Sequence, residues 1–317
     1  MRAAYVRTPQ PEAPASAVEV GEVEPAEPPR GWVPVDVRAA SLNMHDVWML
    51  RGATLGPGSL PLVLGSDAAG TSEGREVLVH PVLPDQPGTL APGATLLCDG
   101  GFGTLAPRTW VPAGNLVDKP AWLDWHQAAC LPTAWLTAWR MLVTKAGIEP
   151  GMAVLVQGAG GGVATAAAAL AKAHGCRVHV TSRSEEKRER ALALGADTAI
   201  APGERVAELV DVVIEPVGAA TWAHSLKALR PGGTLVVCGA ATGFAAVTDL
   251  GRVFARQLRI LGSTMGSVEE LRDLVAFVDA HRVEPVVDSC VGLDQTPQQY
   301  ERLVAGEGFG KLCVVPA

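Results

Sequence analysis

The chain has 317 residues, of which 48% are apolar and 19% charged, so we expect a well-buried globular protein long enough for two domains. A net charge of −7, with no run of Lys or Arg, argues against binding to nucleic acid or to an anionic membrane surface. The six cysteines are scattered, the opening MRAAYVRTPQPE lacks an apolar signal region, and no apolar stretch is long enough for a bilayer. We therefore expect a cytoplasmic protein with reduced cysteines, although their even number is also compatible with disulfides.

Residues 1–120 predict an irregular, mostly-β domain. They are rich in Pro and Gly and contain short β-like runs, such as Val33–Val37 and Glu76–His80. Frequent turn residues between short runs of this kind are typical of β structure.

Residues 121–262 predict an α/β domain, because strands and helices alternate there. The expected helices are Gly161–His174 and Ser184–Leu194. The expected strands are rich in Val, Ile and Leu, as in a parallel sheet buried on both faces. They are Met152–Gln157, Arg177–Thr181, Asp211–Ile214, Thr234–Cys238 and Leu258–Leu261. This alternation predicts an open, doubly wound parallel sheet.

Residues 263–317 no longer follow this strand–helix alternation and form the third expected segment. Ser267–Glu270 has the pattern of a capping box and predicts a helix to about His281. A second helix is expected from Thr296, with Pro297 at its first position, and a closing strand at Phe309–Val315.

A glycine-rich turn follows the first strand of the α/β domain. It consists of Gly158, Ala159, Gly160, Gly161, Gly162, Val163 and Ala164 and leads into the first helix. Glycines let a backbone turn sharply and let a pyrophosphate approach main-chain N–H groups at the positive end of a helix. A turn without a ligand is the alternative, but the strand and helix on either side favour a dinucleotide site.

The end of the second strand indicates which dinucleotide is bound. Sites for NAD place an acidic residue there, on the ribose 2′-hydroxyl. This chain has Ser182 and Arg183 instead, with Lys187 one helical turn further on. Because these side chains suit a 2′-phosphate, we expect NADP(H). The alternative is that Arg183 and Lys187 pair with glutamates of the same helix, at positions 185, 186 and 189.

Several segments, in this order, resemble the medium-chain dehydrogenase/reductase superfamily over essentially the whole chain. They are Ala40–Asp46, Leu64–Gly70, Asp99–Thr104, Val111–Leu116, Leu131–Trp139, Arg230–Gly233 and Phe309–Lys311. The resemblance implies a Rossmann cofactor domain at 121–262 and an irregular, mostly-β GroES-like catalytic domain at 1–120. Residues 263–317 would return to the catalytic domain.

The family divides into zinc-dependent and zinc-free members. Zinc-dependent alcohol dehydrogenases place Cys, His and Cys at positions that fall here on Asn43, Ser66 and Thr133. Amide and hydroxyl oxygens suit zinc far less than thiolate or imidazole. Those enzymes also have a lobe with four cysteines that holds a second zinc. It is missing here, since the segment His80–Gly100 is shortened and contains only Cys98. His45 has no evident partner ligand in the sequence. We therefore expect no metal.

The absence of zinc ligands favours an acceptor that is already activated. A quinone or an α,β-unsaturated carbonyl spreads incoming charge to a distant oxygen, whereas an ordinary ketone depends on the metal. The zinc-free members that this sequence resembles are quinone and alkenal reductases. The prediction is an NADPH-dependent reductase of a small conjugated acceptor. The alternatives are a metal-free alcohol dehydrogenase-like enzyme and a non-enzymatic NADPH-binding protein.

The resemblance also suggests which residues act in catalysis. Asn43 would orient the substrate or the carboxamide, Thr137 would pack behind the nicotinamide, and Thr133 would face the substrate. His45 is a candidate proton donor, with solvent as the alternative. Asp46 and Asp67 would brace the two loops.

Further cofactor contacts are expected past the ends of later strands, where ligands of open α/β sheets bind. They are Gly218, Gly239, Ala240, Thr264 and Met265, with ordinary turn geometry as the alternative for the glycines. From the resemblance we also expect a homodimer formed through the apolar segments Ala240–Val247 and Leu258–Leu261.

Overall fold

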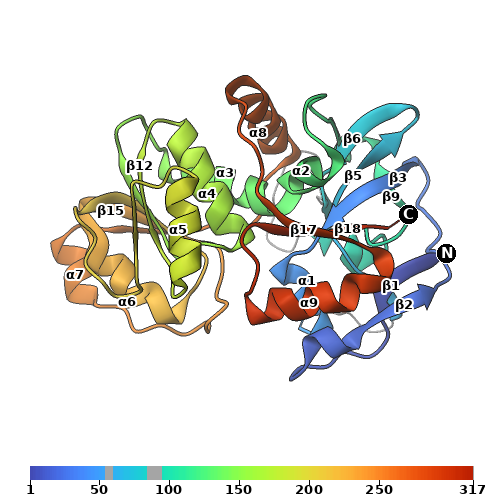
Figure 1. Ribbon diagram of the computed structural model, residues 1–317, viewed down its shortest axis with the longest axis horizontal. Coiled ribbons are helices and arrows are strands. Elements are labelled where there is room, and N and C mark those ends of the chain that lie inside the picture. The colour runs from blue at the N-terminus through green and yellow to red at the C-terminus, as the bar shows by residue number, and fades with distance from the viewer. Residues whose placement is uncertain (54–59, 84–94, 317) are drawn as a thin grey trace. The chain divides into compact units, whose positions relative to one another are not determined.

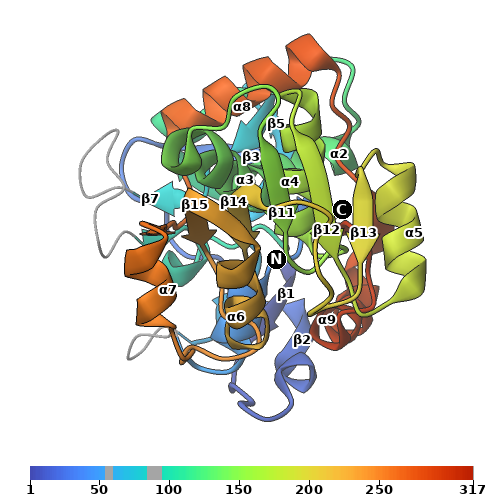
Figure 2. The same ribbon diagram turned by 90° about the vertical axis from the view of Figure 1, so that its left-hand side faces the viewer.

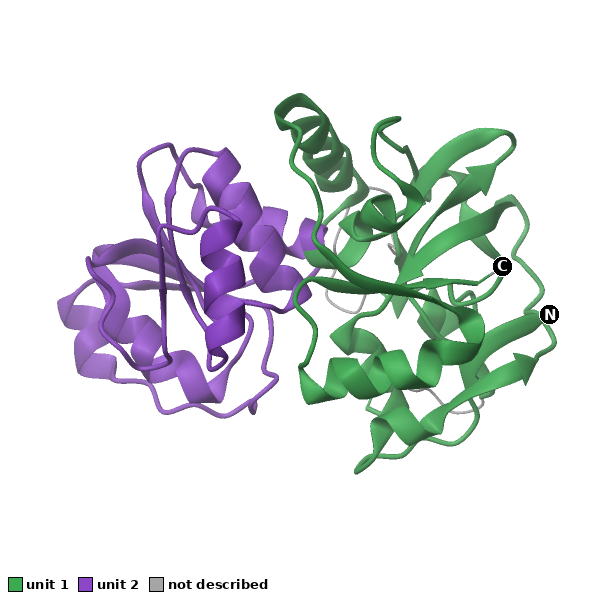
Figure 3. Cartoon of the chain, viewed as in Figure 1, with its two compact units in different colours: residues 1–134, 266–317 green, residues 135–265 purple. Residues whose placement is uncertain are grey.

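The computed structural model describes residues 1–53, 60–83 and 95–316. Two compact units are present: unit 1 comprises residues 1–134 and 266–317, and unit 2 comprises residues 135–265 (Figures 1 and 3). The boundary expected after residue 120 precedes the observed one, because helix α2 (Trp125–Ala129) packs against strands β3 and β5 of unit 1. The second boundary falls after residue 265, where residue 262 was expected.

Unit 2 contains a parallel six-stranded sheet with the strand order β13-β12-β11-β14-β15-β16. Numbered within the sheet, this is the order 3-2-1-4-5-6 of a dinucleotide-binding fold, and it confirms the predicted doubly wound sheet. Figure 2 shows β15, β14, β11, β12 and β13 side by side in that order. The strands are β11 (Ala153–Val156), β12 (Arg177–Thr181), β13 (Thr198–Ile200), β14 (Val210–Glu215), β15 (Leu229–Val237) and β16 (Arg259–Gly262).

Helices alternate with these strands, as expected for a parallel sheet. The first begins at the glycine-rich turn, and the second is capped by Ser184, whose hydroxyl accepts the backbone N–H of Lys187. Leu155, Val213 and Leu235, each from a different strand, belong to one buried core cluster with Leu226. The helices are α4 (Gly162–Ala173), α5 (Glu185–Ala193), α6 (Ala219–Ala228) and α7 (Leu250–Ala255), preceded by α3 (Leu136–Trp139) and the π-helical turn η5 (Arg140–Ala146).

Unit 1 is built on a mixed sheet with the order β10-β6-β5-β3-β18-β17, and β9 also pairs with β3. The remaining strands of unit 1 form the sheet β2-β1-β4 and the pair β7-β8. The strands are β1 (Arg2–Val6), β2 (Val18–Glu22), β3 (Trp32–Ser41), β4 (Leu62–Val63), β5 (Asp67–Ser72), β6 (Arg75–Val79), β7 (Val82–Leu83), β8 (Thr95–Leu96), β9 (Arg108–Pro112), β10 (Leu116–Asp118), β17 (Val287–Gly292) and β18 (Lys311–Val315). This mostly-β unit, with its second segment returning from the end of the chain, confirms the predicted GroES-like fold.

Short helices connect the strands of unit 1. The capping box at Ser267–Glu270 is confirmed, because the Ser267 and Glu270 side chains each accept the other's backbone N–H at the start of α8. The helices are α1 (Met44–Leu50), α2, α8 (Val268–His281) and α9 (Thr296–Ala305). Single turns are η1 (Pro14–Ala17), η2 (Cys98–Gly100), η3 (Ala113–Asn115), η4 (Leu131–Trp135) and η6 (Leu293–Gln295). In the described residues, every helix is too short or too polar to cross a membrane.

Candidate active site

The glycine-rich turn of residues 158–164, here called the phosphate turn, joins β11 to α4 in unit 2. Gly158 and Gly160 have φ values of +76° and +110°, which favour glycine over residues with a side chain. A Cβ atom on Gly158 would lie 2.7 Å from Cγ2 of Val217. The first N–H groups of α4 have no acceptor within the helix, so they can donate to an anion bound at the turn. These residues fit a dinucleotide pyrophosphate.

The end of β12 braces the phosphate turn. Ala159 N donates to the carbonyl of Thr181 at 2.7 Å, and Gly158 N donates to the Thr181 hydroxyl at 3.2 Å. That hydroxyl in turn donates to Oε1 of Gln157 at 2.7 Å, and the Gln157 amide donates to Ser225 Oγ at 2.9 Å. The turn is therefore held against the neighbouring strand before any ligand binds.

The residues expected to choose the cofactor lie just beyond β12. Ser182 is buried, and its hydroxyl accepts the N–H of Ser184 at 3.3 Å. Arg183 is exposed, and within the described residues its guanidinium has no ion-pair partner. On α5, Glu186 pairs with Arg190, at 3.9 Å. Arg183 is thus not engaged by the α5 glutamates, which for this residue was the alternative to phosphate binding.

One residue at this loop escaped the sequence prediction. Arg188 Nη1 donates to the carbonyl of Ser182 at 2.8 Å and so closes the loop that carries Arg183. Its position on α5 resembles that of any solvent-facing helical arginine, and the sequence gives no separate signal for this contact.

Gly218 and Gly239 have a packing reason to be glycine. Gly218 has φ +97°, and a Cβ there would lie 2.8 Å from the Cα of Ala240. A Cβ on Gly239 would lie 2.6 Å from the carbonyl oxygen of Pro216. The ends of β14 and β15 therefore approach closely. This geometry accounts for both glycines without a cofactor, and their contact with one stays a prediction.

Thr137 and Met265, which were expected at the nicotinamide end, lie together in unit 2. The Thr137 hydroxyl is 4.0 Å from the sulfur of Met265. Met265 has φ +41°, a left-handed conformation that is uncommon outside glycine and often marks a functional or constrained position.

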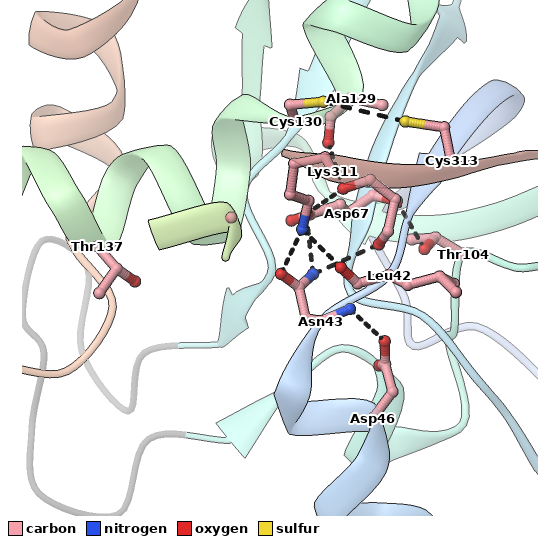
Figure 4. Close-up of polar contacts among 12 residues, drawn as sticks. Leu42, Asn43, Asp46, Asp67, Thr104, Ala129, Cys130, Thr137, Lys311 and Cys313 are labelled. Carbon is pink, nitrogen blue, oxygen red and sulfur yellow. Dashed lines mark hydrogen bonds and ion pairs between the residues drawn. The ribbon is translucent and has the colours of Figure 1, made fainter. Parts of the chain in front are cut away.

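In unit 1, the most prominent polar group is a buried lysine that the sequence analysis did not place in the site (Figure 4). Lys311 begins β18, and its side chain is 3% exposed. Its Nζ donates to the carbonyl of Leu42 and to Oδ1 of Asn43, both at 2.6 Å, and lies 3.3 Å from Oδ2 of Asp67. We call these four residues the ammonium cluster. All three N–H groups of the lysine have acceptors in it.

The ammonium cluster fixes the side chain of Asn43. Nδ2 of Asn43 donates to Asp67 Oδ2 at 2.8 Å, while Oδ1 receives the lysine. Asn43 also opens α1, and its backbone N–H donates to Asp46 Oδ2 at 2.9 Å. Burial raises the pKa of Asp46 to about 6, against the lowering effect of that hydrogen bond. Asp46 and Asp67 thus brace the loops of residues 40–46 and 64–70, as the resemblance implied. Both polar atoms of the Asn43 side chain are engaged in hydrogen bonds, so this side chain is fixed in place.

The three positions that hold zinc in the zinc-type relatives do not fit zinc in this chain. Asn43 is occupied by Lys311 and Asp67, so a cationic ammonium already neutralises the carboxylate there. Ser66 is buried, with its hydroxyl 3.3 Å from Sγ of Cys98. The Thr133 hydroxyl in η4 is buried and has no hydrogen-bond partner among the described residues. Neutral oxygens beside an ammonium are poor ligands for a divalent metal.

His45 is not isolated, although the sequence offered it no evident partner. Its Nε2 lies 3.3 Å from Oδ1 of Asp99, and Cys98 is next to Asp99 in η2. Burial opposes the charged imidazole, but the hydrogen bond to Asp99 and the carboxylates of Asp46 and Asp99 outweigh it and raise the pKa of His45. Burial, with Asp46 and Asp99, raises the pKa of the Cys98 thiol well above its ordinary value. More than fifty residues separate His45 from Cys98 and Asp99, so their proximity could not be recognised from the sequence.

Comparisons with known proteins agree with this fold. The family model described as zinc-binding dehydrogenase matches residues 162–280. A zinc-type alcohol dehydrogenase-like protein of Schizosaccharomyces pombe is 33% identical over 312 residues, covering 89% of this chain and 90% of the relative. Quinone oxidoreductase of Mus musculus is 28% identical over 305 residues, covering 89% and 88%.

Solved structures give the same result over the full length. An NAD-dependent alcohol dehydrogenase matches with a TM-score of 0.91 and 33% identity, covering 99% of both chains. A 2-octenoyl-CoA carboxylase reductase in complex with NADP and 2-octenoyl-CoA matches with a TM-score of 0.90 and 25% identity, covering 99% of this chain and 87% of that one. The chain is an oxidoreductase that belongs to the medium-chain dehydrogenase/reductase superfamily.

Proposed function

We propose that the protein uses NADPH to reduce a small conjugated acceptor, a quinone or an α,β-unsaturated carbonyl compound, without zinc at Asn43, Ser66 and Thr133. The observation that carries the proposal is the buried ammonium of Lys311, which is bound to Asp67 and to Asn43, the position where zinc-dependent members of the family have a cysteine ligand. An acceptor that delocalises the incoming charge needs no metal to polarise it.

The choice of NADPH rests on the end of β12. Arg183 is exposed and without an ion-pair partner among the described residues, and an arginine of this kind suits the 2′-phosphate. The NADP-bound 2-octenoyl-CoA carboxylase reductase supports the same cofactor, whereas the alcohol dehydrogenase at 33% identity uses NAD. Gly158–Val163 would hold the pyrophosphate, and Arg183, with Ser182 and Lys187 beside it, would hold the 2′-phosphate.

In this proposal, bound NADPH supplies the hydride, and the residues of unit 1 prepare the acceptor to receive it. The orphaned hydroxyl of Thr133 donates a hydrogen bond to the acceptor oxygen, on which negative charge develops. Asn43 keeps the loop before α1 in place through its bonds to Lys311 and Asp67. The proton that completes the reduction comes from His45 or from solvent.

A metal-free alcohol dehydrogenase-like activity is the second candidate. It is favoured by the similarity to a zinc-type alcohol dehydrogenase-like protein and to an alcohol dehydrogenase structure, both at 33% identity. Under this alternative, simple ketones and alcohols would be turned over as well as conjugated acceptors.

Steady-state oxidation of NADPH and NADH with a 1,4-quinone, an enone and a simple ketone tests the proposal. We expect turnover of the first two acceptors with NADPH and little with the ketone. Preferred turnover of the ketone would replace the proposal with the alcohol dehydrogenase-like activity. Tight NADPH binding without turnover of any acceptor would indicate a non-enzymatic binding protein.

We also propose that the protein forms a homodimer through the β16 edge of the parallel sheet. β16 is the last strand at that edge, and exposed apolar side chains lie near it in the sequence. The exposed fractions are 93% for Val247, 70% for Leu250, 75% for Phe254 and 37% for Ile260. Such a concentration of exposed apolar residues is typical of an interface. Sedimentation at micromolar concentration as a monomer would contradict the dimer.

A further inference from the structure

His45, Cys98 and Asp99 place three metal-ligand atoms in one small region of unit 1. One ligand atom from each residue, the imidazole nitrogen, the thiol sulfur and a carboxylate oxygen, lies within 4.8 Å of the other two. His45 comes from the first turn of α1, and Cys98 and Asp99 are consecutive in η2. We propose that these three residues form a zinc site that is distinct from the zinc positions of the family.

The donor set and its geometry suit zinc. Imidazole, thiolate and carboxylate are the ligand types of zinc sites, at bond lengths of roughly 2.0–2.3 Å. In a tetrahedron with such bonds the ligand atoms are about 3.3–3.8 Å apart. The His45 and Asp99 atoms already lie at 3.3 Å, and the Cys98 sulfur, within 4.8 Å of a ligand atom of each, would move closer to complete the set. Three protein ligands leave a fourth position for water, as in open zinc sites.

Exposure and neighbouring contacts also fit an ion entering from solvent. Cys98 is buried, whereas the His45 and Asp99 side chains are 24% and 19% exposed. Oδ2 of Asp99 accepts the N–H of Leu96 at 3.0 Å, which orients Oδ1 toward His45. Ser66 Oγ lies 3.3 Å from Cys98 Sγ and is placed to donate to a thiolate. Hydrogen bonds of this kind to the ligands raise metal affinity.

The site lies beside the family's zinc positions without using them. Ser66, which stands where zinc-type relatives have a histidine ligand, contacts the proposed ligand Cys98 and is not itself a ligand. The inference does not depend on the proposed function, because it concerns metal binding by residues of unit 1 alone. With zinc bound, the His45 nitrogen that faces Asp99 is a metal ligand and cannot deliver a proton, so solvent then completes the reduction.

Zinc content and cobalt absorption test the proposal directly. The protein is dialysed with zinc and then against metal-free buffer, and the metal is counted by elemental analysis. We expect about one zinc per chain in the wild type and almost none in Asp99→Asn, an isosteric change of a partly exposed carboxylate. The cobalt-loaded wild type should show a near-ultraviolet thiolate-to-cobalt charge-transfer band, and Cys98→Ser should lose it. Ser66→Ala should weaken zinc binding by about 10- to 100-fold without abolishing it.

Matched controls separate the site from adventitious binding. His126→Ala alters another His–Asp pair of unit 1, with nitrogen and oxygen 3.8 Å apart, and Cys176→Ser removes a buried thiol in unit 2. Both should keep one zinc and the cobalt band, whereas His45→Ala should lose them. Sub-stoichiometric zinc in the wild type, or equal zinc in Asp99→Asn, His45→Ala and the controls, would overturn the proposal, whether or not Cys98→Ser folds.

Discussion

Lys311 and Asn43 come from opposite ends of the chain, yet Nζ of one lies 2.6 Å from Oδ1 of the other. The same ammonium lies 3.3 Å from Asp67 Oδ2 at a site where all three side chains are buried. A buried cation of this kind compensates a buried carboxylate, and it ties the loop before α1 to the last strand.

Replacing Lys311 with Met should destabilise the protein strongly, because Asp67 would keep a buried charge without its partner. Losses on breaking a buried ion pair are about 3–5 kcal/mol in the free energy of unfolding. Chemical denaturation of Lys311→Met, Asp67→Asn and the double variant gives the coupling between the two residues. The double variant should lose clearly less than the sum of the two single losses. Additive losses would mean that the two charges do not compensate each other.

The Thr133 hydroxyl should matter for turnover and not for stability. It is buried without a partner, so Thr133→Val should leave the free energy of unfolding equal or slightly higher. We expect kcat to fall by tenfold or more if the hydroxyl donates to the acceptor oxygen.

The matched control for Thr133 is Thr104→Val, because the Thr104 hydroxyl donates to the carbonyl of Asp67 at 2.8 Å. That variant should lose about 1–3 kcal/mol of unfolding free energy. An unchanged kcat in Thr133→Val would remove this threonine from the mechanism.

Arg183 should set the preference between the two nicotinamide cofactors. Arg183→Ala should weaken NADPH binding by about tenfold or more, the effect of a lost charge-assisted hydrogen bond, and should change NADH binding little. Fluorescence titration with both cofactors measures this. Arg190→Ala is the control, because Arg190 pairs with Glu186 on the same helix. Equal weakening for NADH and NADPH would show that Arg183 does not contact the 2′-phosphate.

His80 should make the stability of unit 1 sensitive to acid. Burial lowers its pKa, although its hydrogen bond of 2.9 Å to the Gly266 carbonyl and the nearby Glu269 act the other way. The folded protein therefore favours the neutral ring. The contribution of His80 to the free energy of unfolding is fully present above the pKa of a histidine in the unfolded chain, about 6.5, and is lost as the pH falls below that value.

His80→Gln keeps an N–H donor and cannot become charged. Its melting temperature should therefore fall less than that of the wild type between pH 7.5 and pH 5. His126→Gln, at a more exposed histidine of the same unit, serves as the control. Parallel curves for the wild type and His80→Gln would exclude a role for His80 in acid sensitivity.

The larger elements of unit 2 could be predicted from the sequence because each has a local signature. In β12 four buried residues follow the exposed Arg177, and its predicted bounds are those observed. Ser184 and Ser267 mark helix starts through caps that act within three residues. β13 was not predicted, because its three residues are only half-buried and carry no pattern. Helices α6 and α7 were also missed, since α6 begins at Gly218 without a side-chain cap, and α7, although Asp249 caps it, has only six residues.

The site residues likewise divide into those with a local sequence signature and those that only the fold brings together. The phosphate turn is local, so its glycines could be recognised directly. Lys311 could not be placed, because its partners lie more than 240 positions earlier in the chain. Cys98 and Asp99 likewise meet His45 only through the pairing of strands that are distant in sequence. Burial and long-range pairing are properties of the folded chain, which a single sequence does not display.

Strand β18, which carries Lys311, lies between β3 and β17 in the main sheet of unit 1. During synthesis, Asn43 and Asp67 leave the ribosome long before this strand exists. While unit 2 is being synthesised, the N-terminal part of unit 1 therefore has an incomplete sheet, and the Asp67 carboxylate has no ammonium partner. Unit 2 is continuous in sequence and can fold first. Assembly of unit 1 is the late, non-local step, the stage at which a chain of this design is most exposed to aggregation.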